Sequence, residues 1–90
     1  MILNDSSYIY RSVEEIKAHP ERVFRLNLSK QKLDTFPPEI FECTNLIELD
    51  LSKNKIEEIP PQIGRLINLE KLSMANNGLV HLPKEIGKLT

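Results

Sequence analysis

The stretch LIELDLSKNKIEEIPPQIGRLIN, residues Leu46 to Asn68, does not keep one apolar rhythm. Leu49 and Leu51 alternate with Asp50, which is the spacing of a short strand with one buried face. A lone Asn54 follows among the apolar residues, and a Pro-Pro pair comes after it. The stretch therefore predicts a strand, then a bend, and not one continuous helix.

The second half of the same stretch predicts a return segment. Pro60 and Pro61 exclude a helix across the middle of the unit and start a new segment. Ile63 and Leu66 are three residues apart, which fits a short turn of helix or 3₁₀-helix that faces the same core as the strand.

This unit recurs with a period of 23 residues. The units are VFRLNLSKQKLDTFPPEIFECTN (23–45), LIELDLSKNKIEEIPPQIGRLIN (46–68) and LEKLSMANNGLVHLPKEIGKLT (69–90), the last one residue short. The conserved apolar columns are Val23/Leu46/Leu69, Leu26/Leu49/Leu72, Leu28/Leu51/Met74, Leu33/Ile56/Leu79, Phe36/Ile59/Leu82 and Ile40/Ile63/Ile86. No single unit can bury its apolar residues alone, so we expect an α/β solenoid with a parallel sheet and helical crossovers on its convex side.

The pattern LxxLxLxxNxLxxLPxxIGxLxN resembles the leucine-rich repeat family over about Val23 to Thr90. The tails IPPQIGRL and LPKEIGKL are similar to the LPxxIGxL variety found in bacterial repeat proteins and in eukaryotic Ras-suppressor-like proteins. The first repeat departs from the pattern, because Gln31 replaces the motif asparagine and Phe41 and Cys43 replace the Gly and Leu of the tail. Terminal repeats are commonly atypical, since one side of them meets a cap.

Asn54 and Asn77 are predicted to be structural. Behind the strand the backbone turns and leaves N–H and C=O groups without partners, and each buried orphan costs about 1–3 kcal/mol. An asparagine amide both donates and accepts, so it can satisfy groups on its own turn and on the adjacent one. Gln31 stands at the same position of this structural ladder, but its longer side chain does not fit the same slot unchanged.

The two ends of the chain carry separate expectations. Ser12 and Glu15 form a capping-box sequence that predicts a helix over 12–19, which Pro20 stops. We expect residues 1–22 to be an N-terminal arm and capping helix, with Tyr8, Ile9 and Tyr10 on the flank; the alternative is a frayed arm that orders only in a complex. The chain stops at Leu89-Thr90 without a polar closing element, which favours an excerpt of a longer protein or an open edge that meets another chain or a second copy.

The composition argues against several classes of function. Twelve basic and 13 acidic residues give a net charge of −1, which predicts no nucleic-acid and no membrane partner. The single Cys43 occupies a leucine column and makes no internal disulfide, and neither His19 nor His81 has metal-ligand spacing to it. We expect no metal, no cofactor and no catalytic residues. No signal peptide and no membrane-spanning apolar run is seen, which favours a cytoplasmic location.

The outward residues of the expected strands give the candidate binding surface. We expect a non-catalytic module that binds a protein or peptide partner through the concave sheet face, as the family resemblance also implies. The alternative is a capping, solenoid-initiating segment of a longer repeat protein that associates through its open C-terminal edge. Arg25, Glu48 and Lys71 also fit mutual pairing across neighbouring strands. The candidate partner-binding residues are Phe24, Arg25, Asn27, Ile47, Glu48, Asp50, Lys53, Glu70, Lys71 and Ser73.

Overall fold

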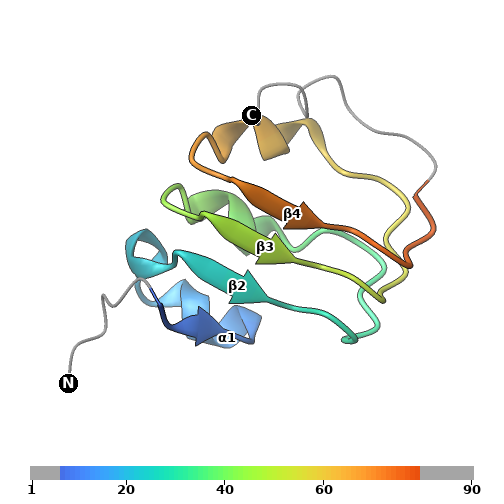
Figure 1. The fold of residues 1–90 in the computed structure, drawn as a ribbon, viewed down its shortest axis with the longest axis horizontal. Coiled ribbons are helices and arrows are strands. Elements are labelled where there is room, and N and C mark those ends of the chain that lie inside the picture. The colour runs from blue at the N-terminus through green and yellow to red at the C-terminus, as the bar shows by residue number, and fades with distance from the viewer. Residues whose placement is uncertain (1–6, 80–90) are drawn as a thin grey trace.

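A single parallel sheet organises the computed structural model, which describes residues 7–79 of the chain. Its strands run side by side in the order β1-β2-β3-β4 (Figure 1). Their bounds are β1 Ile9–Tyr10, β2 Arg25–Asn27, β3 Glu48–Asp50 and β4 Lys71–Ser73. All three neighbouring pairs are parallel, which confirms the predicted parallel sheet.

The repeat period sets the register of the sheet. Arg25 pairs with Glu48, and Glu48 pairs with Lys71, so equivalent residues of successive repeats lie opposite one another. Because the side chains of a strand alternate between its faces, this register stacks each sequence column on one side of the sheet.

Short 3₁₀-helices return the chain behind the sheet, as predicted. They are η2 Pro38–Glu42 and η3 Pro61–Arg65, and each begins with a proline. A proline fits the first helical position because its missing N–H would have no partner there. Ile40 and Ile63 are buried on these helices and belong to the common hydrophobic core.

The core lies between the sheet and the 3₁₀-helices. Leu26 and Leu49, at the centres of β2 and β3, are each only 2% exposed. The apolar columns of the first two repeats supply most of the other buried residues. Phe41, which stands where the second repeat has Gly64, is also buried and stacks on Phe36 with ring centroids 5.1 Å apart.

The N-terminal helix is shorter than the sequence predicts. α1 spans Val13–Lys17, five residues, with Ser12 as N-cap accepting a 3.2 Å hydrogen bond from the backbone N–H of Glu15. The predicted helix over 12–19 is therefore longer than the one that forms. A proline disfavours helical geometry at the residue before it, and His19 has φ −142° and ψ 70°. Pro20 instead begins a separate 3₁₀-helix, η1 Pro20–Arg22.

The segment before α1 joins the sheet, which the sequence did not predict. Tyr8 to Tyr10 were expected to cover a flank, but Ile9 and Tyr10 form β1 and pair with Arg25 and Leu26 of β2. Two residues are too few to show strand periodicity in a sequence.

Two further expectations concern the ends and the membrane. The open edge expected at Leu89-Thr90 lies outside the described residues. Among residues 7–79, no helix has the length and apolar character needed to cross a bilayer.

Candidate functional site

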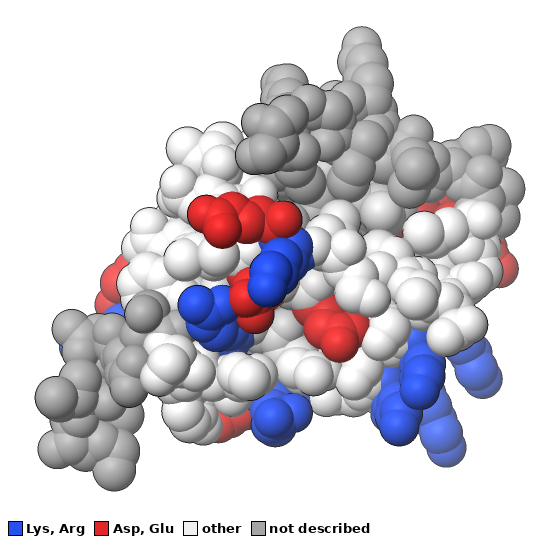
Figure 2. All heavy atoms as spheres, in the orientation of Figure 1, with Lys and Arg blue, Asp and Glu red and all other residues white. Residues whose placement is uncertain are grey.

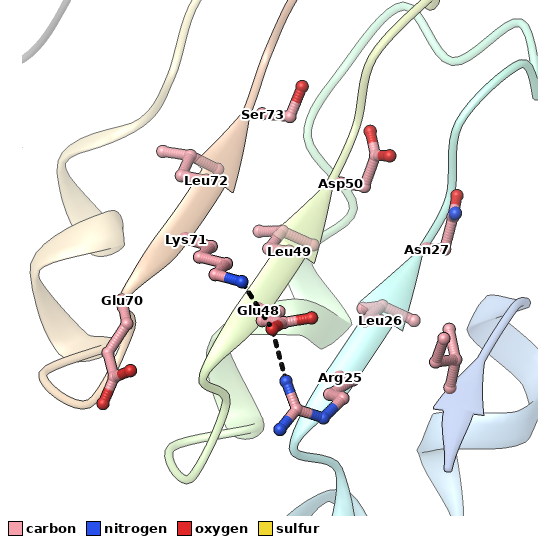
Figure 3. A pocket seen from close by; sticks show the side chains of 11 residues that line it. Arg25, Leu26, Asn27, Glu48, Leu49, Asp50, Glu70, Lys71, Leu72 and Ser73 are labelled. Atoms are coloured by element: carbon pink, nitrogen blue, oxygen red, sulfur yellow. Dashed lines mark ion pairs between the residues drawn. The ribbon is translucent and has the colours of Figure 1, made fainter. Parts of the chain in front are cut away.

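The sheet face opposite the 3₁₀-helices, here called the open face, carries most of the candidate binding residues. A hollow of about 540 Å³ lies on it, and every strand contributes to its lining (Figure 3). Its lining includes seven of the ten candidates: Arg25, Asn27, Glu48, Asp50, Glu70, Lys71 and Ser73.

The charges at the centre of this hollow pair across three strands. The Glu48 carboxylate on β3 lies between Arg25 of β2 and Lys71 of β4 (Figure 3). Its Oε2 forms an ion pair with Nη1 of Arg25 and lies 3.4 Å from Nζ of Lys71. The hydrogen bond from Arg25 is the main cause that lowers the pKa of Glu48 below its usual value, and Lys71 adds to it. These three residues thus make a compact ionic row, with Glu48 as the shared acceptor.

Asn27 and Asp50, at the carboxyl ends of β2 and β3, shape the turns that follow. Asn27 Oδ1 accepts hydrogen bonds from the backbone N–H of Ser29 at 3.0 Å and from its hydroxyl at 2.8 Å. Asp50 Oδ1 accepts one from the backbone N–H of Ser52 at 2.9 Å. These are Asx-type turns, so both candidates have a structural role beside any binding role.

A second, smaller hollow of about 320 Å³ lies at the amino ends of the strands. Phe24 and Ile47 line it together with Glu70, and both apolar side chains are half-buried, not exposed as the sequence pattern implied. Ile67 also lines this hollow and is 73% exposed. The sequence reasoning missed Ile67, although it stands in a column otherwise filled by threonine, Thr44 and Thr90.

Asn54 is buried to 7% exposure and ties two coils together. Its Oδ1 accepts hydrogen bonds from the backbone N–H groups of Gln31 and Leu33 in the first repeat, each at 3.0 Å. Its Nδ2 donates to the carbonyl oxygens of Leu28 at 3.0 Å and Leu51 at 2.9 Å. One amide therefore satisfies turn groups of its own repeat and of the preceding one.

The other two positions of the motif-asparagine column, Gln31 and Asn77, form different contacts. Asn77 repeats the arrangement one coil later, accepting from the backbone N–H of Ile56 at 3.0 Å and donating to the carbonyl of Leu51 at 2.8 Å. Gln31 is exposed, and its Nε2 instead donates to the carbonyl of Arg11, beside β1, at 2.9 Å.

A second asparagine column, which the sequence reasoning did not single out, joins the coils before the strands. Asn45 Nδ2 donates to the carbonyl of Glu21 at 2.9 Å, and Asn68 Nδ2 donates to the carbonyl of Thr44 at 3.1 Å. The signal was present, because Asn45 and Asn68 are one repeat period apart.

Cys43 is fully buried, and burial raises the pKa of its thiol to about 12. The thiolate is the reactive form, so burial and the raised pKa both disfavour reaction of this cysteine in the folded protein. Within residues 7–79 no group of three or more His, Cys, Asp or Glu side chains is placed to hold a metal ion. Lys53, the remaining candidate, lines neither hollow and lies in the turn after β3.

The repeated register, the 3₁₀ returns and the asparagine columns define a parallel-stranded solenoid. The family model described as leucine rich repeat matches residues 21–79, and the chain belongs to the leucine-rich repeat family. Curated proteins give no match to the chain.

Two solved structures show the same fold. A leucine-rich repeat protein of Leptospira interrogans is 32% identical with a TM-score of 0.54, covering 91% of this chain and 27% of that one. The leucine-rich repeat domain of APL1B is 26% identical with a TM-score of 0.66, covering 80% of this chain and 22% of that one. The chain thus spans about a quarter of the length of either structure. Domains of this family generally mediate protein–protein interaction and are generally not enzymes.

Proposed function

We propose that this chain is a protein-binding module whose concave, open face holds an extended segment of a partner. The observation that carries the proposal is the hollow of about 540 Å³ lined from all four strands. Polar and charged side chains project into it from a rigid, hydrogen-bonded backbone, which is the arrangement that orients a ligand at low entropic cost.

The smaller hollow supplies apolar contacts for the same partner. Phe24, Ile47 and Ile67 line it, and Glu70 lines both hollows, so the two are adjacent at this residue. Apolar and aromatic side chains in such a recess contribute most of the affinity at protein interfaces, while the surrounding polar groups give orientation.

The test starts with selection of a random-peptide display library on the immobilised chain. Affinities of the recovered peptides are then measured by fluorescence anisotropy for the wild type and for the double variant Phe24→Ala, Ile47→Ala. We expect the double variant to bind about tenfold or more weakly, because two partly exposed apolar anchors are removed.

A control variant separates this surface from the rest of the molecule. Glu42→Ala with Gln62→Ala changes two exposed residues on the 3₁₀-helices behind the sheet and is expected to bind like the wild type. Equal binding by the Phe24, Ile47 variant, or loss only in the control, would reject the open face as the binding surface.

We further propose that residues 7–22 cap the amino-terminal end of the solenoid. Ile16 of α1 is fully buried in the common core, and α1 packs against η2. The Glu15 carboxylate accepts hydrogen bonds from the Tyr8 hydroxyl and the Arg11 backbone N–H, each at 2.9 Å, which fastens β1 to α1.

The cap is tested by Ile16→Ala. Burial at this level predicts a loss of about 2–4 kcal/mol in the free energy of unfolding by urea. Ala18→Gly, at the exposed carboxyl end of the same helix, is the control and should cost no more than about 1 kcal/mol. A loss at Ile16 as small as that of the control would show that this segment is not part of the folded core.

A further inference from the structure

Four lysines gather on the two turns that leave the open face. Figure 2 shows basic side chains grouped at the lower right, beyond the carboxyl ends of β2 and β3, with no acidic side chain of the described residues among them in this view. The lysines of these turns, here called the lysine cluster, are Lys30, Lys32, Lys53 and Lys55, and all four are exposed.

The backbone holds the cluster together. The turn residues 28–33 and 51–56 are hydrogen-bonded to each other, with the Lys30 N–H donating to the Ser52 carbonyl at 3.1 Å and the Lys55 N–H to the Leu33 carbonyl at 2.7 Å. Equivalent positions on neighbouring parallel strands are about 4.8 Å apart. The lysines of one turn therefore lie beside those of the next on a rigid frame.

The conformation of this frame does not favour lysine. Lys30, Lys32 and Lys53 have φ of 58°, 59° and 60°, in the left-handed region where glycine and asparagine are the usual residues. The third repeat has Asn76 at the position equivalent to Lys30 and Lys53, with φ 58°. At this position the turn is thus compatible with an asparagine, so Lys30 and Lys53 add positive charge that the backbone does not need.

The cluster is also electrostatically unlike the centre of the open face. Arg25 and Lys71 are each paired with Glu48. None of the ion pairs formed among residues 7–79 involves a lysine of the cluster. Like charges held close together repel one another, and an anionic partner would relieve this repulsion.

The surroundings favour protein carboxylates over a polyphosphate. Glu48, Asp50 and Glu70 lie on the adjoining sheet face, and the chain as a whole has net charge −1, so an extended nucleic acid or an anionic bilayer meets repulsion next to the cluster. A short acidic segment of a polypeptide can contact the cluster alone.

We propose that the lysine cluster binds an acidic segment of the protein partner, next to the part of that partner that lies on the open face. The proposal rests on the proposed function, because the turns follow directly from β2 and β3. It adds the chemistry of the partner: carboxylate side chains immediately beside the segment held by the sheet.

The test uses the full chain and a fluorescein-labelled peptide of alternating glutamate and serine, which places its carboxylates on one face when extended. The variant is Lys30→Asn, Lys32→Asn, Lys53→Asn. Asparagine adopts the left-handed conformation more readily than lysine, so the variant should keep a thermal midpoint at or above that of the wild type. We expect its affinity for the acidic peptide to fall about tenfold or more, and wild-type binding to weaken as salt is added.

The matched control removes three positive charges elsewhere. Lys17→Gln, Arg22→Gln, Arg65→Gln changes basic residues of α1, η1 and η3 and should retain the affinity for the acidic peptide. A peptide of alternating glutamine and serine should not bind. Equal loss in both variants would assign the binding to net charge alone and overturn the proposal.

Three other results would also overturn it: no detectable binding of the acidic peptide at low salt, tighter binding of a single-stranded oligonucleotide, or tighter binding of anionic phospholipid vesicles. The open face is judged separately by the Phe24, Ile47 variant. If display-selected peptides lose affinity for that variant but not for the lysine variant, the proposed function stands and only the acidic segment is rejected.

Discussion

The first and second repeats share the parallel strand and the 3₁₀ return, but they differ in the hydrogen bonds that hold the turn after the strand. In the second repeat, Asn54 is buried and its amide serves turn groups of both its own coil and the coil before it. In the first repeat, Gln31 is exposed and its longer side chain reaches the carbonyl of Arg11. The asparagine of one repeat thus forms hydrogen bonds with the turn of the repeat that precedes it.

This difference explains why the first repeat does without the motif asparagine. The first repeat is preceded by β1 and α1 and not by another repeat with the same turn. β1 pairs with β2, and Ile9 lies opposite Arg25. There the longer glutamine side chain donates to the carbonyl of Arg11, beside β1. Phe41 is also specific to the first repeat, where it stands at the position of Gly64 in the second repeat. Phe41 lies on η2, the 3₁₀-helix that α1 packs against.

The largest expected effect comes from replacing Asn54, the residue by which the second repeat differs from the first. Asn54→Leu leaves the part-buried N–H groups of Gln31 and Leu33 without their acceptor and the buried Leu28 carbonyl without its donor from Asn54, and should lower the free energy of unfolding by roughly 2–4 kcal/mol. Gln31→Leu removes one exposed hydrogen bond and should cost less than about 1 kcal/mol. Urea denaturation followed by circular dichroism measures both, and equal losses would contradict the proposed roles of the two positions.

A smaller effect is expected from the ionic row that joins the repeats across the open face. The pKa of Glu48 is lower in the folded protein, so its pairing stabilises the fold above the unfolded pKa of the carboxyl and is lost as the pH falls through the folded pKa. Glu48→Gln should therefore lower the urea midpoint slightly at about pH 7 and by less at about pH 3, because the carboxyl becomes increasingly protonated below the ordinary glutamate pKa.

Glu70→Gln is the control for that experiment, because Glu70 lines the same hollow but forms no ion pair with another of the described residues. The urea midpoint of the Glu70 variant should stay close to that of the wild type at both pH values, because no ion pair among the described residues is removed. A Glu48 variant that is equally destabilised at both pH values would indicate a packing effect and not a charge effect.

The smallest effect, no reaction at all, is expected at Cys43. Its full burial and a pKa of about 12 predict that a thiol reagent such as 5,5′-dithiobis(2-nitrobenzoic acid) reacts only after unfolding in urea. Thr44→Cys in a Cys43→Ala background provides the control, since position 44 is exposed and the introduced thiol should react in the folded protein. Rapid reaction of native Cys43 would show that the first repeat opens more readily than its packing implies.

Sequence reasoning was most reliable where one period was repeated. The columns of Leu26, Leu49 and Ile63 predicted the parallel sheet, its buried face and the 3₁₀ returns, because each position is constrained by an equivalent one in the next coil. It was least reliable before the first repeat. β1 has no repeat equivalent and only two residues, and α1 ends after five.

For the candidate surface, the 23-residue period brought seven candidate residues to one hollow, but it did not predict how deeply each side chain is buried. Phe24 and Ile47 are half-buried, and Ile67 is the apolar residue most exposed near them. The exposed fraction of each depends on how neighbouring loops pack, which a column of residue types does not contain.

By itself the sequence determined the repeat, the inward and outward faces of each strand and the structural asparagines, because these follow from periodicity and from the need to pair buried backbone groups. Only the tertiary structure decided that Gln31 faces β1, that Glu48 is shared between Arg25 and Lys71, and that lysines of two separate repeats form one cluster. The physical reason is that each of these contacts joins residues from different coils, and their distances are set by the packing of one coil on the next.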